Sequence, residues 1–422
     1  MRKEYSALIN RLFTKARNEG VIQQPIQNET FNGRDVIVNG KKQLFWASCS
    51  YLGLETDERL KRASIDAVER YGTQLSASRA VIESGQYGEL ESLLGEIFGK
   101  PTLLAPTTSL GHISVIPIIV NELDALIMDQ KVHNSVQNAI LMARDEKIHV
   151  ETLNHNRMDF LETRIQILLQ KYNRVWYFLD GVYSMFGDLA PYDDLKYLLN
   201  KYPNFHIYVD DAHGLGWAGT NGAGTTIRDI GWHQNMILTT SLAKSFASCG
   251  GALVFDNEEQ KSLIRNCGSS FIFSGPIQPA VLGASIAAAK IYLSDEIYTI
   301  QKDVNELITY FIDYANQLCI PLITSAHSPI VYIGVGKLEV GKKLMRFLMA
   351  QGHFATSMGF PAVQMNNSGI RVCITRNHTK ADIKEFLDLV AEGLIMLLHE
   401  VDQDLTDVYD AFGITPLAVS NI

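Results

Sequence analysis

The chain has 422 residues, of which 46% are hydrophobic and 20% charged, and these proportions exclude a disordered chain, a coiled coil and a collagen-like rod. Lys and Arg total 37 against 46 Asp and Glu, so the net charge of -9 provides no basic field for nucleic acid or an anionic membrane. We therefore expect a compact soluble protein of two or three packed subdomains, whose partners are small molecules or a second copy of itself.

The N-terminal segment and the cysteines indicate a cytoplasmic protein. The first 20 residues place apolar side chains at helical spacing among basic ones without a continuous apolar core, which predicts an amphipathic helix rather than an export signal. The most apolar stretch, 113–120, is too closely bounded by polar residues to span a membrane. Five scattered cysteines, none in a C-x-x-C pair, argue against a disulfide framework or a zinc site, so we expect reduced thiols and no metal.

The sequence next predicts a hairpin and then a parallel sheet. In residues 36–46, Asn39-Gly40 separates two alternating apolar runs, which is typical of a tight hairpin. From about residue 57, helical patterns alternate with short apolar runs such as RVWYFLD (174–180) and MILTT (236–240). This alternation predicts a mostly parallel sheet wrapped by helices, and the nearly continuous apolar runs indicate strands covered on both faces.

The last third of the chain follows a different pattern. One long helical region, roughly 276–318, is followed by strands near 330–335 and 370–374 and by helices at 339–351 and 379–399, which predicts a smaller α+β domain. The tail beyond Val401 has four Asp and no basic residue, so we expect a solvated extension or a local partner contact. The predicted organisation is a helix and hairpin lobe (1–56), a large domain (57–290), the small domain (291–400) and an acidic tail (401–422).

Two segments combine an apolar strand with reactive polar residues. In HIYVDDAHGLG (206–216), the strand ends in Asp210, Asp211 and His213, which we expect to project into a cleft at the carboxyl end of the sheet. In MILTTSLAKSFASCGGALVF (236–255), Lys244 interrupts a run of small and apolar residues. Desolvation would make this amine available for Schiff-base chemistry, and a carboxylate such as Asp210 could keep a pyridine nitrogen protonated. Alone, Lys244 could be a surface lysine and Asp210 a turn former; together they indicate a pyridoxal-phosphate site.

From about Phe45 to about Leu397 the chain resembles the α-oxoamine synthase family of fold-type I pyridoxal-phosphate enzymes, whose members include 8-amino-7-oxononanoate synthase, 2-amino-3-ketobutyrate CoA ligase and serine palmitoyltransferase. The resemblance implies a mostly parallel central sheet wrapped by helices, a smaller α+β C-terminal domain and an N-terminal arm. The matching segments occur in the family's order: YLGL (51–54), DQKVHNS (129–135), DGVYSMFGD (180–188), DDAHGLG (210–216), SLAKSF (241–246), FIFSGPIQP (271–279) and GIRVCIT (369–375).

The resemblance implies the catalytic residues one by one. Lys244 forms the internal aldimine, Asp210 pairs with the pyridinium nitrogen, and His213 hydrogen-bonds the phenolic oxygen. His133 matches the histidine that stacks on the ring; the alternative is an ordinary polar residue at a helix start.

The remaining implied residues contact the phosphate, the cofactor edge and the substrate. Arg371 matches the arginine that holds the amino-acid carboxylate, a task suited to a planar bidentate donor; the alternative is a structural salt bridge. Further cofactor contacts are implied at Thr108 and Ser109, where a helix start suits phosphate, and at Ser184, Ser241 and Ser274.

The chain departs from the family pattern at several contact positions. Cys49 replaces the asparagine usually found before YLG, and TQLSASR (73–79) replaces a glycine-rich run. Other usual residues are replaced by Thr108-Ser109, Ala223, Gly275 and Ala362. These changes touch substrate and phosphate contacts, so they bear on specificity more than on the chemistry.

The expected activity is a decarboxylative, Claisen-type condensation of a small α-amino acid with an acyl thioester, carried on coenzyme A or a carrier protein. The segment FIFSGPIQP and the N-terminal helix predict a homodimer with shared active sites. One rival is transamination on the same fold, since a fold fixes chemistry loosely. The other is a catalytically decayed cofactor-binding homologue, although Lys244, Asp210, His133 and Arg371 are all retained.

Overall fold

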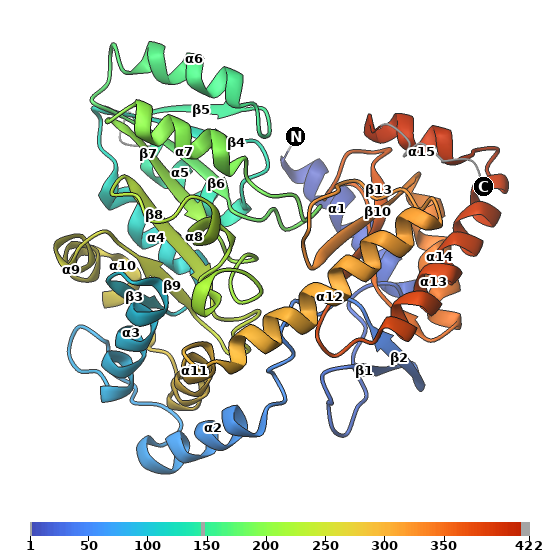
Figure 1. Cartoon of the computed structure of the whole chain (residues 1–422), viewed down its shortest axis with the longest axis horizontal. Coiled ribbons are helices and arrows are strands. Elements are labelled where there is room, and N and C mark those ends of the chain that lie inside the picture. The colour runs from blue at the N-terminus through green and yellow to red at the C-terminus, as the bar shows by residue number, and fades with distance from the viewer. Residues whose placement is uncertain (1, 145–147, 415–422) are drawn as a thin grey trace. The chain divides into compact units, whose positions relative to one another are not determined.

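The computed structural model describes residues 2–144 and 148–414. Its internal contacts divide the chain into two units. Figure 1 shows the whole chain coloured by residue number. The larger unit comprises Leu52–Ser184 and Leu189–Lys302, and the smaller comprises Met1–Tyr51, Met185–Asp188 and Asp303–Ile422.

The larger unit is built on a seven-stranded sheet with the order β3-β9-β8-β7-β6-β4-β5. The pairs from β8 through β7, β6 and β4 to β5 are parallel, whereas β9 runs antiparallel to both β8 and β3. The prediction of a mostly parallel central sheet is therefore confirmed. The strands are β3 (Thr102–Ala105), β4 (Asp124–Asp129), β5 (His149–Leu153), β6 (Arg174–Asp180), β7 (Phe205–Asp210), β8 (Met236–Ser241) and β9 (Gly251–Val254).

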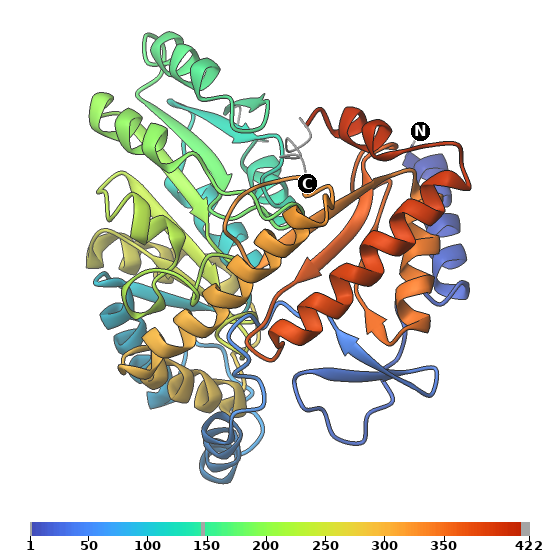
Figure 2. The same ribbon diagram turned by 45° about the vertical axis from the view of Figure 1, so that its right-hand side comes forward.

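Helices cover both faces of this sheet (Figures 1 and 2). Several begin at a side chain that caps the first turn: Thr107 accepts a hydrogen bond from the Leu110 N–H, and Asn257 accepts one from the Gln260 N–H. The helices are α2 (Glu58–Tyr71), α3 (Gly85–Phe98), α4 (Thr108–Ile119), α5 (Asn134–Arg144), α6 (Met158–Leu168), α7 (Tyr192–Lys201), α8 (Thr225–Asp229), α9 (Glu258–Cys267), α10 (Ser269–Ile272) and α11 (Pro279–Tyr292).

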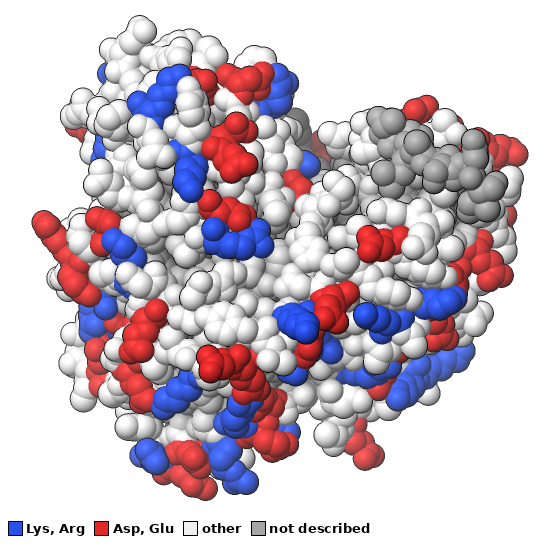
Figure 3. Space-filling view, viewed as in Figure 1, with Lys and Arg blue, Asp and Glu red and all other residues white. Residues whose placement is uncertain are grey.

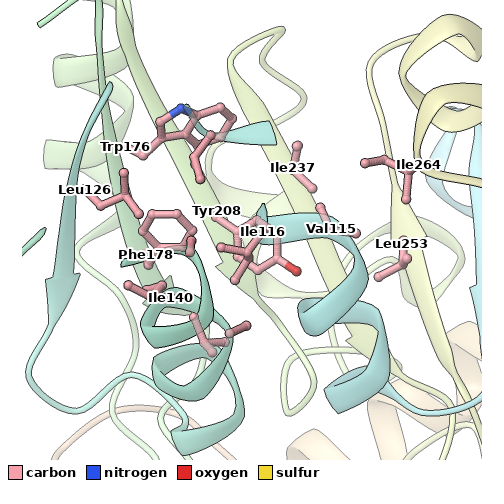
Figure 4. Close-up of a cluster of buried hydrophobic side chains, with 14 of the residues drawn as sticks. Val115, Ile116, Leu126, Ile140, Trp176, Phe178, Tyr208, Ile237, Leu253 and Ile264 are labelled. Atoms are coloured by element: carbon pink, nitrogen blue, oxygen red, sulfur yellow. The ribbon is translucent and has the colours of Figure 1, made fainter. Parts of the chain in front are cut away.

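The core between the sheet and helices α4 and α5 follows from alternation along the strands. Trp176 and Phe178 on β6 point to the same face, since side chains two residues apart share a side of a strand. They join Val115 of α4, Ile140 of α5 and Tyr208 of β7 in one cluster of buried side chains (Figure 4). This packing fixes α4 against the sheet and so places the N-terminal end of α4 at the carboxyl edge of the strands.

The smaller unit contains two three-stranded sheets. The predicted hairpin is confirmed as β1 (Asp35–Val38) and β2 (Lys41–Phe45), and its turn residues Asn39 and Gly40 have φ of 52° and 73°. This hairpin shares its sheet with β11 (His353–Phe354), so the segment 1–56 is not a separate lobe: its first 51 residues belong to the same unit as the C-terminal region. The second sheet has the order β10-β13-β12, with β10 (Ile330–Gly336), β12 (Thr356–Met358) and β13 (Ser368–Cys373).

The helices of the C-terminal region differ from the predictions at one place. The long helical region predicted for 276–318 is two helices, α11 and α12 (Glu296–Gln317), separated by residues 293–295, where the Ser294 hydroxyl donates to the Ile291 carbonyl. The predicted helices at 339–351 and 379–399 are confirmed as α13 (Leu338–Ala350) and α14 (Lys380–His399). The N-terminal amphipathic helix is α1 (Arg2–Asn18).

The acidic tail is not simply a solvated extension over its described part. Asp404 caps α15 (Leu405–Phe412) by accepting hydrogen bonds from the Thr406 and Asp407 N–H groups, so an acidic residue starts the helix. Val408 of this helix is 1% exposed, and the Phe412 ring meets Tyr332 of β10 edge to face. Residues 415–422 of the predicted tail lie outside the described residues.

Two further properties of the described residues concern membrane spans and surface charge. Among the described helices, none combines the length and the apolar character needed to cross a bilayer. On the face drawn in Figure 3, Lys and Arg side chains lie interspersed with Asp and Glu.

Candidate active site

A pocket of about 250 Å³ lies within the larger unit, at the carboxyl edge of its parallel strands. Its walls come from the segments that follow β4, β6, β7 and β8, from the start of α4 and from the residues before β9. Such an edge is where parallel sheets bind ligands, because successive strand ends open there into loops. Seven of the residues predicted from the sequence line this one pocket: Thr108, Ser109, His133, Asp210, His213, Ser241 and Lys244.

Asp210 ends β7 and is a buried carboxylate of the pocket, at 5% exposure. Its Oδ2 lies 3.0 Å from Nε2 of His112, and its Oδ1 accepts a hydrogen bond from the Ala212 N–H. Burial would raise the pKa of Asp210, but His112 and, more weakly, Lys244 oppose this and hold the pKa below its ordinary value. The pocket therefore contains a buried carboxylate that stays ionised.

A second carboxylate, Asp180 at the end of β6, lies opposite Asp210 in the strand register. Burial, and then the charge of Asp210, raise the pKa of Asp180 well above its ordinary value. Asp180 Oδ1 also accepts a hydrogen bond of 2.9 Å from the His133 N–H and so fixes the start of α5. Burial lowers the pKa of the His133 imidazole, which favours a neutral ring at the pocket wall.

The start of α4 and Lys244 also line the pocket. Thr108 and Ser109 are the first residues of α4, and first-turn N–H groups have no partner within a helix. Gly251 makes this part of the pocket possible: a Cβ there would lie 2.7 Å from both N and Cα of Thr108, so only glycine lets β9 approach the helix start. Lys244 follows β8 and is half-buried.

The structure corrects the expectation for Asp211. Asp210 and Asp211 are consecutive, so their side chains point to opposite faces, and only Asp210 and His213 line the pocket. Asp211 instead accepts hydrogen bonds from the Thr226 N–H and from the Thr225 hydroxyl. It fixes the start of α8 rather than a ligand.

Three of the predicted site residues are not among the described residues that line this pocket: Ser184, Ser274 and Arg371. Arg371 belongs to the smaller unit, on β13. There its Nη1 donates to Sγ of Cys373 at 3.1 Å and its Nη2 to Sγ of Cys49 at 3.8 Å. The roles assigned to these three residues by resemblance stay predictions.

Sequence reasoning missed Asp180 and Cys249, which line the pocket, and His112, which is fully buried beside Asp210. Asp180 ends an apolar strand just as Asp210 does, so the same pattern could have identified it. Cys249 is exposed and lines the pocket next to Gly250. His112 lies on the apolar helix α4, 98 residues before Asp210 in the sequence, and no local pattern reveals that α4 carries it to that carboxylate.

Comparison with known proteins assigns the fold and the family. Residues 41–390 match the sequence family described as aminotransferase class I and II. The chain belongs to this family. The structure superposes on serine palmitoyltransferase from S. paucimobilis, solved with a bound PLP-myriocin aldimine, with a TM-score of 0.85 at 20% identity over 94% of this chain and 98% of that one.

Two curated relatives narrow the family further. An 8-amino-7-oxononanoate synthase of Alkaliphilus metalliredigens is 30% identical over 92% of this chain and 95% of its own length. A serine palmitoyltransferase of Bacteriovorax stolpii is 28% identical over 85% of this chain and 84% of its own length. These matches confirm the predicted membership of the α-oxoamine synthase family and the predicted type I fold.

Proposed function

We propose that this chain is a pyridoxal-phosphate-dependent acyltransferase that condenses a small α-amino acid with an acyl thioester and releases carbon dioxide and a thiol. One observation carries the proposal: a single pocket brings together the Lys244 amine, the buried Asp210 carboxylate and the first turn of α4. Two relatives named for amino-acid acyl condensation, an oxononanoate synthase and a serine palmitoyltransferase, support the same reaction class.

The pocket fits pyridoxal phosphate on three counts. The N–H groups at the start of α4 suit a phosphate, and Gly251 lets β9 pack directly against this helix start. Asp210 supplies an ionised carboxylate for a protonated ring nitrogen, and Lys244 supplies the amine that carries the cofactor aldehyde. His133, with its pKa lowered by burial, offers a neutral ring for stacking, and His213 and Ser241 complete the cofactor contacts that we assign.

When bound, pyridoxal phosphate withdraws electrons from Cα of the amino acid and stabilises the negative charge that forms there. The residues of this chain do the remaining work. Asp210 keeps its negative charge and thereby holds the proton on the ring nitrogen. We assign Lys244 as the base that takes the Cα proton once the substrate amine has replaced it, and Arg371 as the group that binds the substrate carboxylate. We also assign Ser184 and Ser274 to the cofactor edge, as the resemblance implies.

The active protein in this proposal is a cytoplasmic homodimer with shared sites. The larger unit exposes Phe273 to 86%, in the segment FIFSGPIQP that reaches the neighbouring subunit in the family the chain resembles. The small α-amino acid and the acyl thioester are the small-molecule partners. The pocket retains Lys244, Asp210 and His133 together. This argues against the alternative that the chain is a homologue that has lost catalysis.

The test is a panel of acyl thioesters, on coenzyme A and on a carrier protein, combined in turn with glycine, alanine and serine. We expect thiol release that requires both substrates, is accompanied by carbon dioxide and disappears in Lys244→Ala. Amino-group transfer to a keto acid without thiol release would identify the enzyme as an aminotransferase instead. A chain that binds the cofactor but catalyses neither reaction would be the decayed homologue.

A further inference from the structure

A hydrogen-bonded chain of three side chains connects the pocket to the apolar core. The Tyr208 hydroxyl lies 2.8 Å from Nδ1 of His112, and Nε2 of the same imidazole lies 3.0 Å from Oδ2 of Asp210. Tyr208 and His112 are both 0% exposed, and Tyr208 belongs to the apolar cluster of Figure 4. The proposed function uses Asp210 and gives no task to the other two side chains.

The chemistry of these groups assigns a direction to the chain. Burial raises the pKa of Tyr208 well above its ordinary value, so its hydroxyl keeps a proton to donate. An ionised carboxylate only accepts hydrogen bonds, so Nε2 of His112 carries the hydrogen that points at Asp210. A neutral imidazole of that tautomer leaves Nδ1 to accept from Tyr208. Each group is thus satisfied in one direction, from Tyr208 through His112 to Asp210.

Asp210 needs such a partner because of Asp180. The two carboxylates face each other across β6 and β7, and they are 5% and 3% exposed. Neighbouring buried carboxylates disfavour each other's ionisation. Burial and the charge of Asp210 accordingly raise the pKa of Asp180. At Asp210, the interaction with His112 outweighs the effect of burial, so the pKa of Asp210 is lowered. Of these two carboxylates, Asp210 is the one that His112 hydrogen-bonds, and the imidazole therefore favours the charge on Asp210.

We propose that His112 is a positioning residue that keeps Asp210 ionised and aimed at the ring nitrogen of the cofactor, while Tyr208 fixes the tautomer of the imidazole. This inference rests on the proposed function, because it requires pyridoxal phosphate in the pocket. It also gives α4 two tasks. Its first turn, at Thr108, faces the phosphate, and His112, one turn later, holds the carboxylate at the other end of the ring.

The experiment compares cofactor binding by the wild type with that of three variants. His112→Leu removes both hydrogen bonds, His112→Gln keeps an N–H donor at about the reach of Nε2, and Tyr208→Phe removes only the hydroxyl. Each apoprotein is titrated with pyridoxal phosphate, and the dissociation constant and the wavelength of the visible absorption band are measured. We expect His112→Leu to bind on the order of tenfold to a hundredfold more weakly, with a shifted band, because a hydrogen bond to a charged group is lost.

The other two variants separate positioning from packing. His112→Gln should recover most of the affinity and the wild-type band, since it restores the donor to Asp210 without the imidazole. Tyr208→Phe should weaken binding in the same direction but less. Ser114→Ala is the matched control: Ser114 lies on the same helix, is 1% exposed and hydrogen-bonds Ser270 rather than a pocket residue. It should keep the wild-type affinity and band.

The outcomes are distinguishable. Wild-type affinity and band in His112→Leu would overturn the inference, and so would a Gln variant that behaves like the Leu variant. If His112→Leu does not fold, an unchanged affinity and band in Tyr208→Phe overturns it instead. A wild-type chain that binds no pyridoxal phosphate at all would refute the proposed function itself, and the inference with it, before any variant is compared.

Discussion

Asp210 and Asp211 are consecutive residues whose different surroundings give them opposite tasks. Side chains alternate along a strand, so one carboxylate enters the pocket and the other faces α8. Asp210 has the His112 imidazole beside it, whereas Asp211 accepts hydrogen bonds from the Thr225 hydroxyl and the Thr226 N–H. Burial, opposed by these hydrogen bonds, raises the pKa of Asp211 to about 6. A carboxylate with a neighbouring imidazole and one without it thus differ in the direction of their pKa shifts.

This difference predicts the pH dependence of stability. The folded state binds the Asp211 proton more tightly than the unfolded state, so the contribution of Asp211 is fully present below its ordinary pKa of 3.8 and is lost as pH rises through about 6. The loss is on the order of 3 kcal/mol. Asp211→Asn stays uncharged, so the melting temperature of the wild type should fall relative to that of the variant as pH rises between these two values. Parallel melting profiles across the same interval would contradict the assignment.

Substitution of Arg371 tests whether this residue binds the substrate or only stabilises the fold. Arg371→Lys keeps the charge but loses the planar fork, and one hydrogen bond to a charged group contributes about 1.5–3 kcal/mol. We therefore expect kcat/KM for the amino acid to fall by about tenfold to a hundredfold, with little change in cofactor loading. Arg376→Lys is the control in the same unit, because Arg376 is paired with Asp303 at 2.9 Å. A lower melting temperature with normal kinetics in Arg371→Lys would make Arg371 a structural residue.

At the scale of elements, α4 depends on its contact with β9. Gly251 lies on β9, between β8 and β3, and a Cβ there would meet N and Cα of Thr108 at 2.7 Å. Both of the contacted atoms are backbone, so the helix start itself would have to move. Residues 108 and 109 would then present their N–H groups at a different place.

Gly251→Ala should therefore weaken pyridoxal-phosphate binding by about tenfold, the equivalent of one hydrogen bond to a charged group, measured by titration of the apoprotein. Gly88→Ala is the matched control. Gly88 is an exposed residue of α3 with nothing within 4 Å of an added Cβ, so this change should keep the affinity. It should also stabilise the fold by about 0.5–1 kcal/mol, since alanine is the better helix former. Wild-type affinity in Gly251→Ala would show that the helix start does not hold the phosphate.

The sequence predicts elements best where the signal is local. Asn39-Gly40 marks the hairpin, and a polar residue after an apolar run marks the strand ends that carry Asp210 and Lys244, because these signals depend on neighbouring residues alone. The place of the hairpin beside β11 depends instead on the pairing of Leu44 with His353, two residues far apart in the sequence. His112 is the same kind of case: its partner Asp210 is 98 residues away, and only the packing of α4 joins them.

At the scale of the whole molecule, the exposed apolar residues are candidates for the interface of the proposed homodimer. Phe273 is 86% exposed and Val81 is 83% exposed, and the Ser78 hydroxyl donates to the Ile272 carbonyl at 2.6 Å, which joins the two loops that carry them. In the smaller unit, α1 exposes Tyr5, Leu8 and Phe13 by 53%, 42% and 45%. Large exposed apolar groups that lie together are typical of protein interfaces. In the proposed homodimer these residues would lie in an isologous contact.

Phe273→Ser should therefore shift the protein toward a monomer, and sedimentation velocity over a range of concentrations measures this shift. Because Ser274 follows directly and is assigned to the neighbouring subunit's cofactor edge, dilution of this variant should also lower its cofactor loading and its activity together. Phe160→Ser is the control, since Phe160 is 51% exposed in the same unit but lies on α6, away from the FIFSGPIQP segment. A wild-type protein that is monomeric and fully active would exclude shared sites. If both variants dissociate equally, the dimer depends on exposed apolar area in general and not on this segment.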